Sequence, residues 1–196
     1  KMKNKGFTLI ELLIVITLLG ILAVAVLSAI NPVEQMNRSR DTATRSDAEQ
    51  LINAIDRYYA TVGYYPWMAN AASENTDLAW TEITAVDQAF GTDGQKMLEL
   101  LSAGASAELK ESYITRIISG SANPLYIYNM GEQGNSTYVC FNPASAAMGL
   151  EAYKRCSAHA DYGALPADFP AEACPDPCTT AGSEDNPPDT CFSCLP

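Results

Sequence analysis

Six cysteines have the most obvious chemistry in this 196-residue chain, and all of them lie in its last third. They are Cys140, Cys156, Cys174, Cys178, Cys191 and Cys194. The last four form two close pairs, which could hold a tetrahedral zinc ion as thiolates. An even number of cysteines in a proline-rich region is instead typical of disulfides in an exported protein. We favour disulfides, with Cys140–Cys156 as the leading pair and the pairing of the last four open.

Three carboxylates near the carboxyl end could bind calcium through their oxygens: Glu184, Asp185 and Asp189. Their spacing matches no standard calcium loop, and two prolines stand between Asp185 and Asp189, so a solvated acidic loop is the favoured interpretation. His159 is the only histidine, and no nucleophile–His–Asp set, phosphate loop or haem motif accompanies it. We therefore expect no enzyme activity, no metal and no cofactor.

Another carboxylate, Glu11, lies at the start of a long apolar stretch. The 19 residues of segment 12–30 carry no charge and are enough to cross a bilayer as a helix. Burying a lone carboxylate in such a segment is costly unless it is paired or protonated. The basic residues Lys1, Lys3 and Lys5 precede the stretch, which predicts a cytoplasmic amino end and an exported remainder. A plain membrane anchor, or a secretory signal cleaved after residues 23–25, would leave Glu11 unexplained.

The run GFTLIELLIVI, which begins at Gly6, resembles the class III signal of type IV pilins and pseudopilins. The resemblance implies a leader that a prepilin peptidase removes between Gly6 and Phe7, followed by N-methylation of Phe7. It also implies that Glu11 meets the amine of a neighbouring subunit's Phe7 during assembly. Because burying charges is expensive, we expect that pair to select a register rather than to add much stability. The family's extended stretch between a glycine and a proline would correspond to Gly20 and Pro32.

The positions of prolines and glycines and the spacing of apolar residues predict the secondary-structure elements that position these residues. Pro32 should break one long helix, since proline removes a helical hydrogen bond. Apolar residues recur at helical spacing from Leu51 to Val62, and Gly63 fits the end of that helix. We divide the chain into a leader (1–6), an apolar membrane and filament-core helix (7–32), an amphipathic stalk (33–63), a globular head (64–162) and a Cys-rich acidic tail (163–196).

The head should be a small antiparallel sheet that packs on the end of the long helix, giving an α+β fold. Strand signals cover residues 113–119, 125–129 and 137–141, and the last two flank a glycine-containing turn. Residues 94–110 favour a short helix, residues 68–93 favour a loop-rich connection, and residues 144–156 fit either a helix or a strand. Six of the seven prolines in the tail forbid long regular elements there, namely Pro166, Pro170, Pro175, Pro177, Pro187 and Pro188.

These expectations lead to a structural role as the major subunit of a type IV pilus, polymerising with identical subunits. A pseudopilin of a type II secretion system is the alternative, and a tethered enzyme or binding module is a third class. The implied partners are the prepilin peptidase, an assembly platform with its ATPase, and the cytoplasmic membrane before export to a surface filament. A net charge of −11 argues against nucleic acid as a general partner. The sequence does not choose among adhesion, motility and DNA uptake.

Overall fold

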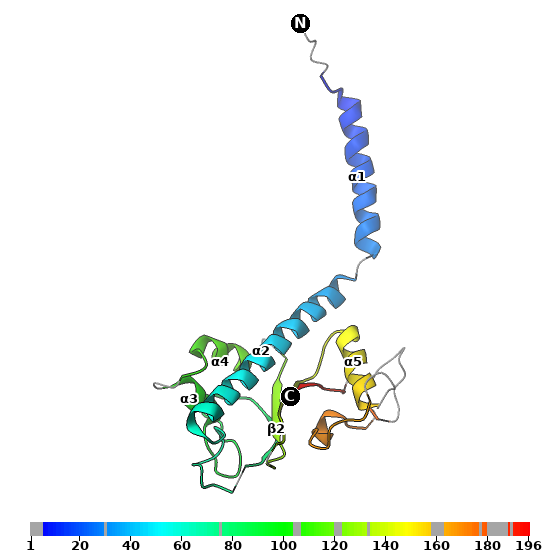
Figure 1. The fold of residues 1–196 in the computed structure, drawn as a ribbon. Coiled ribbons are helices and arrows are strands. Elements are labelled where there is room, and N and C mark those ends of the chain that lie inside the picture. Colours follow the sequence, from blue (N-terminus) through cyan, green and yellow to red (C-terminus); the bar gives the residue numbers. More distant parts are fainter. Residues whose placement is uncertain are drawn as a thin grey trace. The chain divides into compact units, whose positions relative to one another are not determined.

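The computed structural model describes residues 6–29, 31–74, 76–103, 107–119, 123–132, 134–157, 163–176, 178–179, 188 and 190–196. The chain forms two compact units, Lys1–Met36 and Asn37–Pro196. The first contains helix α1 and the start of helix α2, and the second contains the rest of α2 with the head (Figure 1).

Helix α1 spans Leu9–Ala29, and helix α2 spans Pro32–Val62. The expected break is confirmed, and Pro32 is the first residue of α2, where its missing N–H costs nothing. The side-chain oxygen of Asn31 accepts the backbone N–H of Glu34 at 3.3 Å, as an N-cap does. Gly20 lies inside α1, so the helix of this chain continues through it. An extended stretch between Gly20 and Pro32 in a filament therefore stays a prediction.

The carboxyl-terminal half of α2 forms one side of the head's core. Ala48, Leu51, Ile55 and Tyr58 lie three or four residues apart, which places them on one face of the helix, and they are buried. The helix ends at Val62, and the N–H of Gly63 donates to the carbonyl of Tyr59 at 2.8 Å. Gly63 has a φ of 87°, the left-handed conformation in which glycine commonly ends a helix.

The head's sheet has four antiparallel strands in the order β1-β2-β3-β4. The strands are β1 (Leu78–Glu82), β2 (Leu125–Asn129), β3 (Thr137–Phe141) and β4 (Ser193–Leu195). Strands β2 and β3 form the expected hairpin. Their inward side chains, such as Ile127 and Val139, are fully buried in the cluster that includes Leu51 and Ile55 of α2. A helix packed on a small antiparallel sheet confirms the α+β fold.

Two expectations for the head need correction or completion. Residues 113–119 were expected as a strand, yet helix α4 spans Glu111–Ile118. The β-branched and aromatic residues there are those that strands favour, but packing on the core overrides that preference. The expected loop 68–93 contains β1, whose register shifts between Leu78 and Thr81. The remaining helices are α3 (Met97–Ser102), α5 (Ala146–Cys156) and the short 3-10 helix η1 (Ala171–Ala173).

The six cysteines form three disulfides, Cys140–Cys194, Cys156–Cys174 and Cys178–Cys191. The expected pair Cys140–Cys156 is therefore wrong. Strand β4 pairs with β3 so that Cys194 lies directly opposite Cys140, and this pairing across 54 residues brings their sulfurs together. Cys156, at the end of α5, bonds to Cys174 just after η1. The four cysteines that were considered as zinc ligands are all engaged in disulfides.

Candidate functional site

The amino-terminal site is a reciprocal hydrogen-bonded cap at the start of α1. The Glu11 carboxylate accepts the backbone N–H of Thr8 at 2.8 Å and its hydroxyl at 2.7 Å, both through Oε2. In return, the backbone N–H of Glu11 donates to the Thr8 hydroxyl oxygen at 3.3 Å. This is a capping box, which satisfies backbone donors that the first helical turn leaves unpaired. The Thr-x-x-Glu spacing signals it in the sequence, but we had not predicted it.

The cap places the carboxylate of Glu11 at a defined position on the first helical turn. A negative charge is also favourable there because of the helix dipole. Phe7, directly before the cap, is 84% exposed. Within residues 6–29, the bonds that Glu11 accepts use one carboxylate oxygen, and the other can accept a further donor. The arrangement can therefore present both a large apolar side chain and an anion to a neighbouring molecule.

Helix α1 is apolar and exposed on every side, which a helix in water cannot sustain. Its segment Leu9–Ser28 is long and apolar enough to cross a membrane. The exposed large apolar side chains of this region are Phe7, Leu9, Ile10, Leu12, Leu13, Ile14, Val15, Ile16, Leu18, Leu19, Ile21, Leu22, Val24, Val26 and Leu27. They require a partner, which is either lipid or other apolar helices.

A buried carboxylate on α2 joins the stalk to the disulfide-bonded part of the head. Asp41 is completely buried, and its two oxygens accept three hydrogen bonds. The donors are the Asn123 side-chain amide at 2.9 Å, the Ala144 N–H at 2.9 Å and the Ser145 N–H at 2.8 Å. Ser145 is the N-cap of α5, so Asp41 fixes the start of that helix. No local pattern in the sequence marks Asp41 for this role, because its partners lie more than 80 positions away.

A second aspartate, Asp47, lies two turns further along α2 and contacts α4. Its carboxylate forms an ion pair with Arg116, and its backbone carbonyl accepts the Tyr113 hydroxyl at 2.6 Å. Burial raises the pKa of the Asp47 carboxyl above its ordinary value, although the Arg116 guanidinium lowers it. Burial also raises the pKa of the Tyr113 phenol, so the phenol keeps its proton and donates. These contacts explain why residues 111–118 form a helix against the stalk.

Three disulfides cross-link the carboxyl-terminal part of the head. One disulfide joins β3 to β4, and a second joins the end of α5 to the segment after η1. The third joins Cys178 to Cys191, which lies two residues before the start of β4. The calcium candidates Glu184, Asp185 and Asp189 lie outside the described residues, as does His159. Among the described residues, no group of three or more His, Cys, Asp or Glu side chains is placed to hold a metal ion.

Alkylation of the denatured but unreduced protein is expected to label none of its six cysteines, because all six are in disulfides. Peptide mapping without reduction should return the pairs 140–194, 156–174 and 178–191. The same protein reduced before alkylation is the control and should take six labels. A 140–156 linked peptide, or free thiols in stoichiometric amount, would contradict the disulfide arrangement.

The comparisons with known proteins agree with the geometry of the amino-terminal site. Residues 1–27 match the family model described as the prokaryotic N-terminal methylation motif. The chain is 28% identical over 145 residues to the type IV major pilin protein PilE1 of Neisseria gonorrhoeae, covering 72% of this chain and 78% of the relative. It is 29% identical over 147 residues to the fimbrial protein EcpC of Eikenella corrodens, covering 74% and 88% respectively. No solved structure matches. The resemblance to type IV pilins that the first residues indicated is confirmed.

Proposed function

We propose that this protein is a structural subunit of a type IV pilus, most specifically a major pilin, that polymerises through α1. The observation that carries the proposal is a helix exposed and apolar on every side, with one carboxylate in its capped first turn. The methylation motif covers the same residues, and a disulfide-bonded head follows them. We propose no enzymatic role, since both similar proteins are named as pilus or fimbrial proteins.

Before assembly, α1 is inserted in the cytoplasmic membrane with its basic amino end in the cytoplasm. Lipid chains satisfy the helix as well as neighbouring helices do, so transfer to a filament core gains little hydrophobic free energy. Assembly therefore needs external work, which an ATPase and a membrane platform supply. For the same reason, a subunit can return to the membrane when a filament disassembles.

In the filament, the role of Glu11 is to define register. Apolar helices can slide past one another with little change in free energy, but an ion pair in a dry environment is satisfied in one alignment only. The methylated amine of a neighbouring subunit's Phe7 is the proposed partner, and Glu11 has an oxygen available to it. The capping box holds the carboxylate in place before the partner arrives.

Imaging of purified surface filaments, with mass spectrometry of their subunit, tests the proposal. A major pilin should be the abundant subunit of long surface fibres. The alternative, a pseudopilin of a type II secretion system, predicts that native expression gives no long surface fibres and that deletion blocks protein secretion. Deletion of a major pilin should remove the fibres and leave that secretion unchanged.

The mature subunit is expected to begin at Phe7 and to carry one methyl group on its nitrogen. The Gly6–Phe7 junction lies within the matched methylation motif, and this prediction is checked by intact-mass analysis of filament subunits. A Gly6→Leu variant is the control, and it should keep residues 1–6 and stay in the membrane. Filaments built from subunits that still carry residues 1–6 would contradict the proposed processing.

A further inference from the structure

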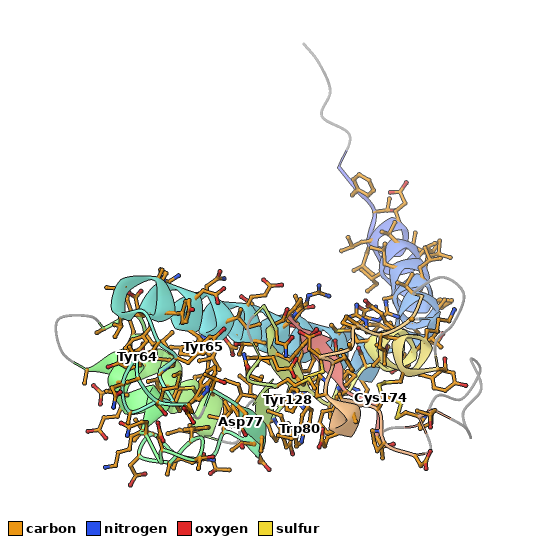
Figure 2. The ribbon with its side chains drawn as sticks, turned by 60° about the horizontal axis from the view of Figure 1, so that its bottom comes forward. Tyr64, Tyr65, Asp77, Trp80, Tyr128 and Cys174 are labelled. Carbon is orange, nitrogen blue, oxygen red and sulfur yellow. A yellow bond between two sulfur atoms is a disulfide. The ribbon has the colours of Figure 1, made fainter. Side chains whose placement is uncertain are left out.

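The disulfides of the head are nested. The first cysteine of the chain, Cys140, bonds to the last, Cys194, across 54 residues. This outer disulfide encloses two inner disulfides, each formed by cysteines that are neighbours in the sequence. The inner disulfides are Cys156–Cys174 and Cys178–Cys191. In Figure 2, Cys174 of one inner disulfide lies at the opposite end of the head from Tyr64.

During export, Cys140 waits for its partner. Because the amino end is expected to stay in the cytoplasm, the head crosses the membrane from α2 towards β4. Cys140 lies on β3, and the buried residues that pack with it include Ala173 and Cys194, which follow later in the chain. Until those residues arrive, the Cys140 thiol has neither its cover nor its partner.

The first cysteine that Cys140 can meet is Cys156, which follows 16 residues later. By loop-closure entropy alone, a loop of this length closes about sixfold more readily than the loop to Cys194. If every cysteine bonds to its next neighbour, the chain acquires a consecutive arrangement of disulfides. Its pairs are Cys140–Cys156, Cys174–Cys178 and Cys191–Cys194. None of these three pairs occurs in the structure.

We propose that this protein matures as a substrate of a thiol–disulfide isomerase, which converts consecutive disulfides into the nested ones. The bonds themselves are made by an exported oxidase that carries a disulfide. Each bond formed removes two electrons and two protons from a pair of thiols and leaves the oxidase as a dithiol. Oxidation alone therefore gives the right number of disulfides in the wrong pairs. The inference rests on export of the head, and it is independent of pilus assembly.

One isomerase thiolate can rearrange all three bonds without net oxidation. It attacks the Cys140 sulfur of the Cys140–Cys156 bond, forms a mixed disulfide with Cys140 and releases the Cys156 thiolate. Each released thiolate then attacks the next consecutive disulfide along the chain, forms one inner disulfide and releases a further thiolate. The last thiolate to be released is that of Cys194. It attacks the mixed disulfide at Cys140, forms the outer disulfide and returns the isomerase thiolate.

The folded head protects the nested disulfides from further exchange. Four of the six cysteines are at most 1% exposed, namely Cys140, Cys178, Cys191 and Cys194. Thiol–disulfide exchange requires that a thiolate reach a sulfur, so burial stops it. Pairing of β4 with β3 also holds Cys194 directly opposite Cys140. The isomerase is needed because uncatalysed rearrangement takes minutes to hours.

Refolding of the reduced full chain in detergent micelles tests the inference. Two reactions contain the same glutathione buffer, and they differ in whether the added isomerase is active or has its thiols alkylated. Peptide mapping without reduction follows the pairs over time. With the alkylated enzyme, we expect the 140–156 linked peptide to dominate early and the three nested pairs to form at least about fivefold more slowly. Equally fast formation of the nested pairs in both reactions would overturn the proposal.

Two double variants test whether the outer disulfide causes this dependence. Cys140→Ser with Cys194→Ser leaves only the inner disulfides, whose cysteines are then consecutive, so the active and the alkylated isomerase should give equal rates. Cys156→Ser with Cys174→Ser is the matched control, since it also leaves four cysteines but keeps the outer pair around an inner one. It should still depend on the isomerase.

Each double variant is compared with its own rate in the presence of active isomerase, so a loss of stability does not affect the ratio. Equal dependence on the isomerase in the two double variants, or no dependence in either, would overturn the proposal.

The same comparison can be made in cells. The full chain and the two double variants are expressed in host bacteria that have or lack an exported thiol–disulfide isomerase. In the host without the enzyme, the membrane-bound parent subunit with nested pairs should fall at least about fivefold. The variant without the outer disulfide should be unaffected. Filaments are not needed for this measurement, so a failure of the pilus proposal leaves it unchanged. Equal amounts of correctly paired parent subunit in the two hosts would overturn the inference.

Discussion

Replacing Glu11 with alanine is expected to lower filament yield by about 100-fold or more while the subunit still accumulates in the membrane. Removing one partner of a buried ion pair costs about 3–5 kcal/mol, and in the proposed filament the contact between Glu11 and a neighbouring amine recurs at every subunit. Membrane insertion should be unaffected or easier, since a costly charge is lost from an apolar segment. The measurement is the amount of sheared surface filament relative to the membrane-bound subunit in the same cells.

The capping box permits a control that separates two roles of Glu11. Glu11→Gln keeps an oxygen that can accept the Thr8 N–H, so it preserves the cap but removes the charge. Thr8→Ala removes the threonine hydroxyl from the cap and keeps the charge. If the carboxylate pairs with a neighbouring amine, Glu11→Gln should fail to assemble much as alanine does. Normal filaments from Glu11→Gln would contradict the pairing and leave the cap as the role of Glu11.

Replacing Asp41 with alanine is expected to destabilise the head by about 3–5 kcal/mol. The change leaves three donors without their acceptor, and each buried unsatisfied donor costs about 1–3 kcal/mol before water enters the space. Thermal unfolding of the membrane-extracted subunit measures the loss. Hydrogen exchange should rise most at the start of α5, since the backbone N–H groups of Ala144 and Ser145 lose their partner there. Exchange that rises uniformly, or not at all, would contradict the proposed link.

A pair of asparagine variants compares how much the carboxylates of Asp41 and Asp47, the two buried aspartates of α2, contribute to the stability of the head. Asp41→Asn places an amide NH₂ where one carboxylate oxygen now accepts a donor, so it should cost about 1.5–3 kcal/mol. Asp47 accepts from Arg116 through one oxygen, which asparagine keeps, and burial already raises the pKa of this carboxyl. Asp47→Asn should therefore cost less than about 1 kcal/mol. Equal losses in the two variants would show that buried charge, and not hydrogen-bond geometry, is decisive.

Local patterns in the sequence correctly predicted those elements whose residues interact with close neighbours in the chain. The apolar run correctly predicted a helix, and Pro32 correctly predicted where it is interrupted. Both predictions depend only on hydrogen bonds and steric clashes within one helical turn. The end of α2 at Gly63 and the hairpin of β2 and β3 followed from residues only a few positions apart. The motif from Gly6 to Glu11 led to the assembly proposal before any tertiary contact was known.

Only the tertiary structure decided features that join distant parts of the chain. Residues 111–118 are helical because they pack on α2 and Arg116 reaches Asp47, which overrides a local preference for strand. Asp41 looks like a solvated residue in the sequence, but it accepts bonds from residues more than 80 positions away. The pair Cys140–Cys194 depends on β4 lying beside β3. The spacing of residue types along the sequence cannot predict such contacts. The free energy that stabilises them comes from burial and pairing of segments that meet only when the chain folds.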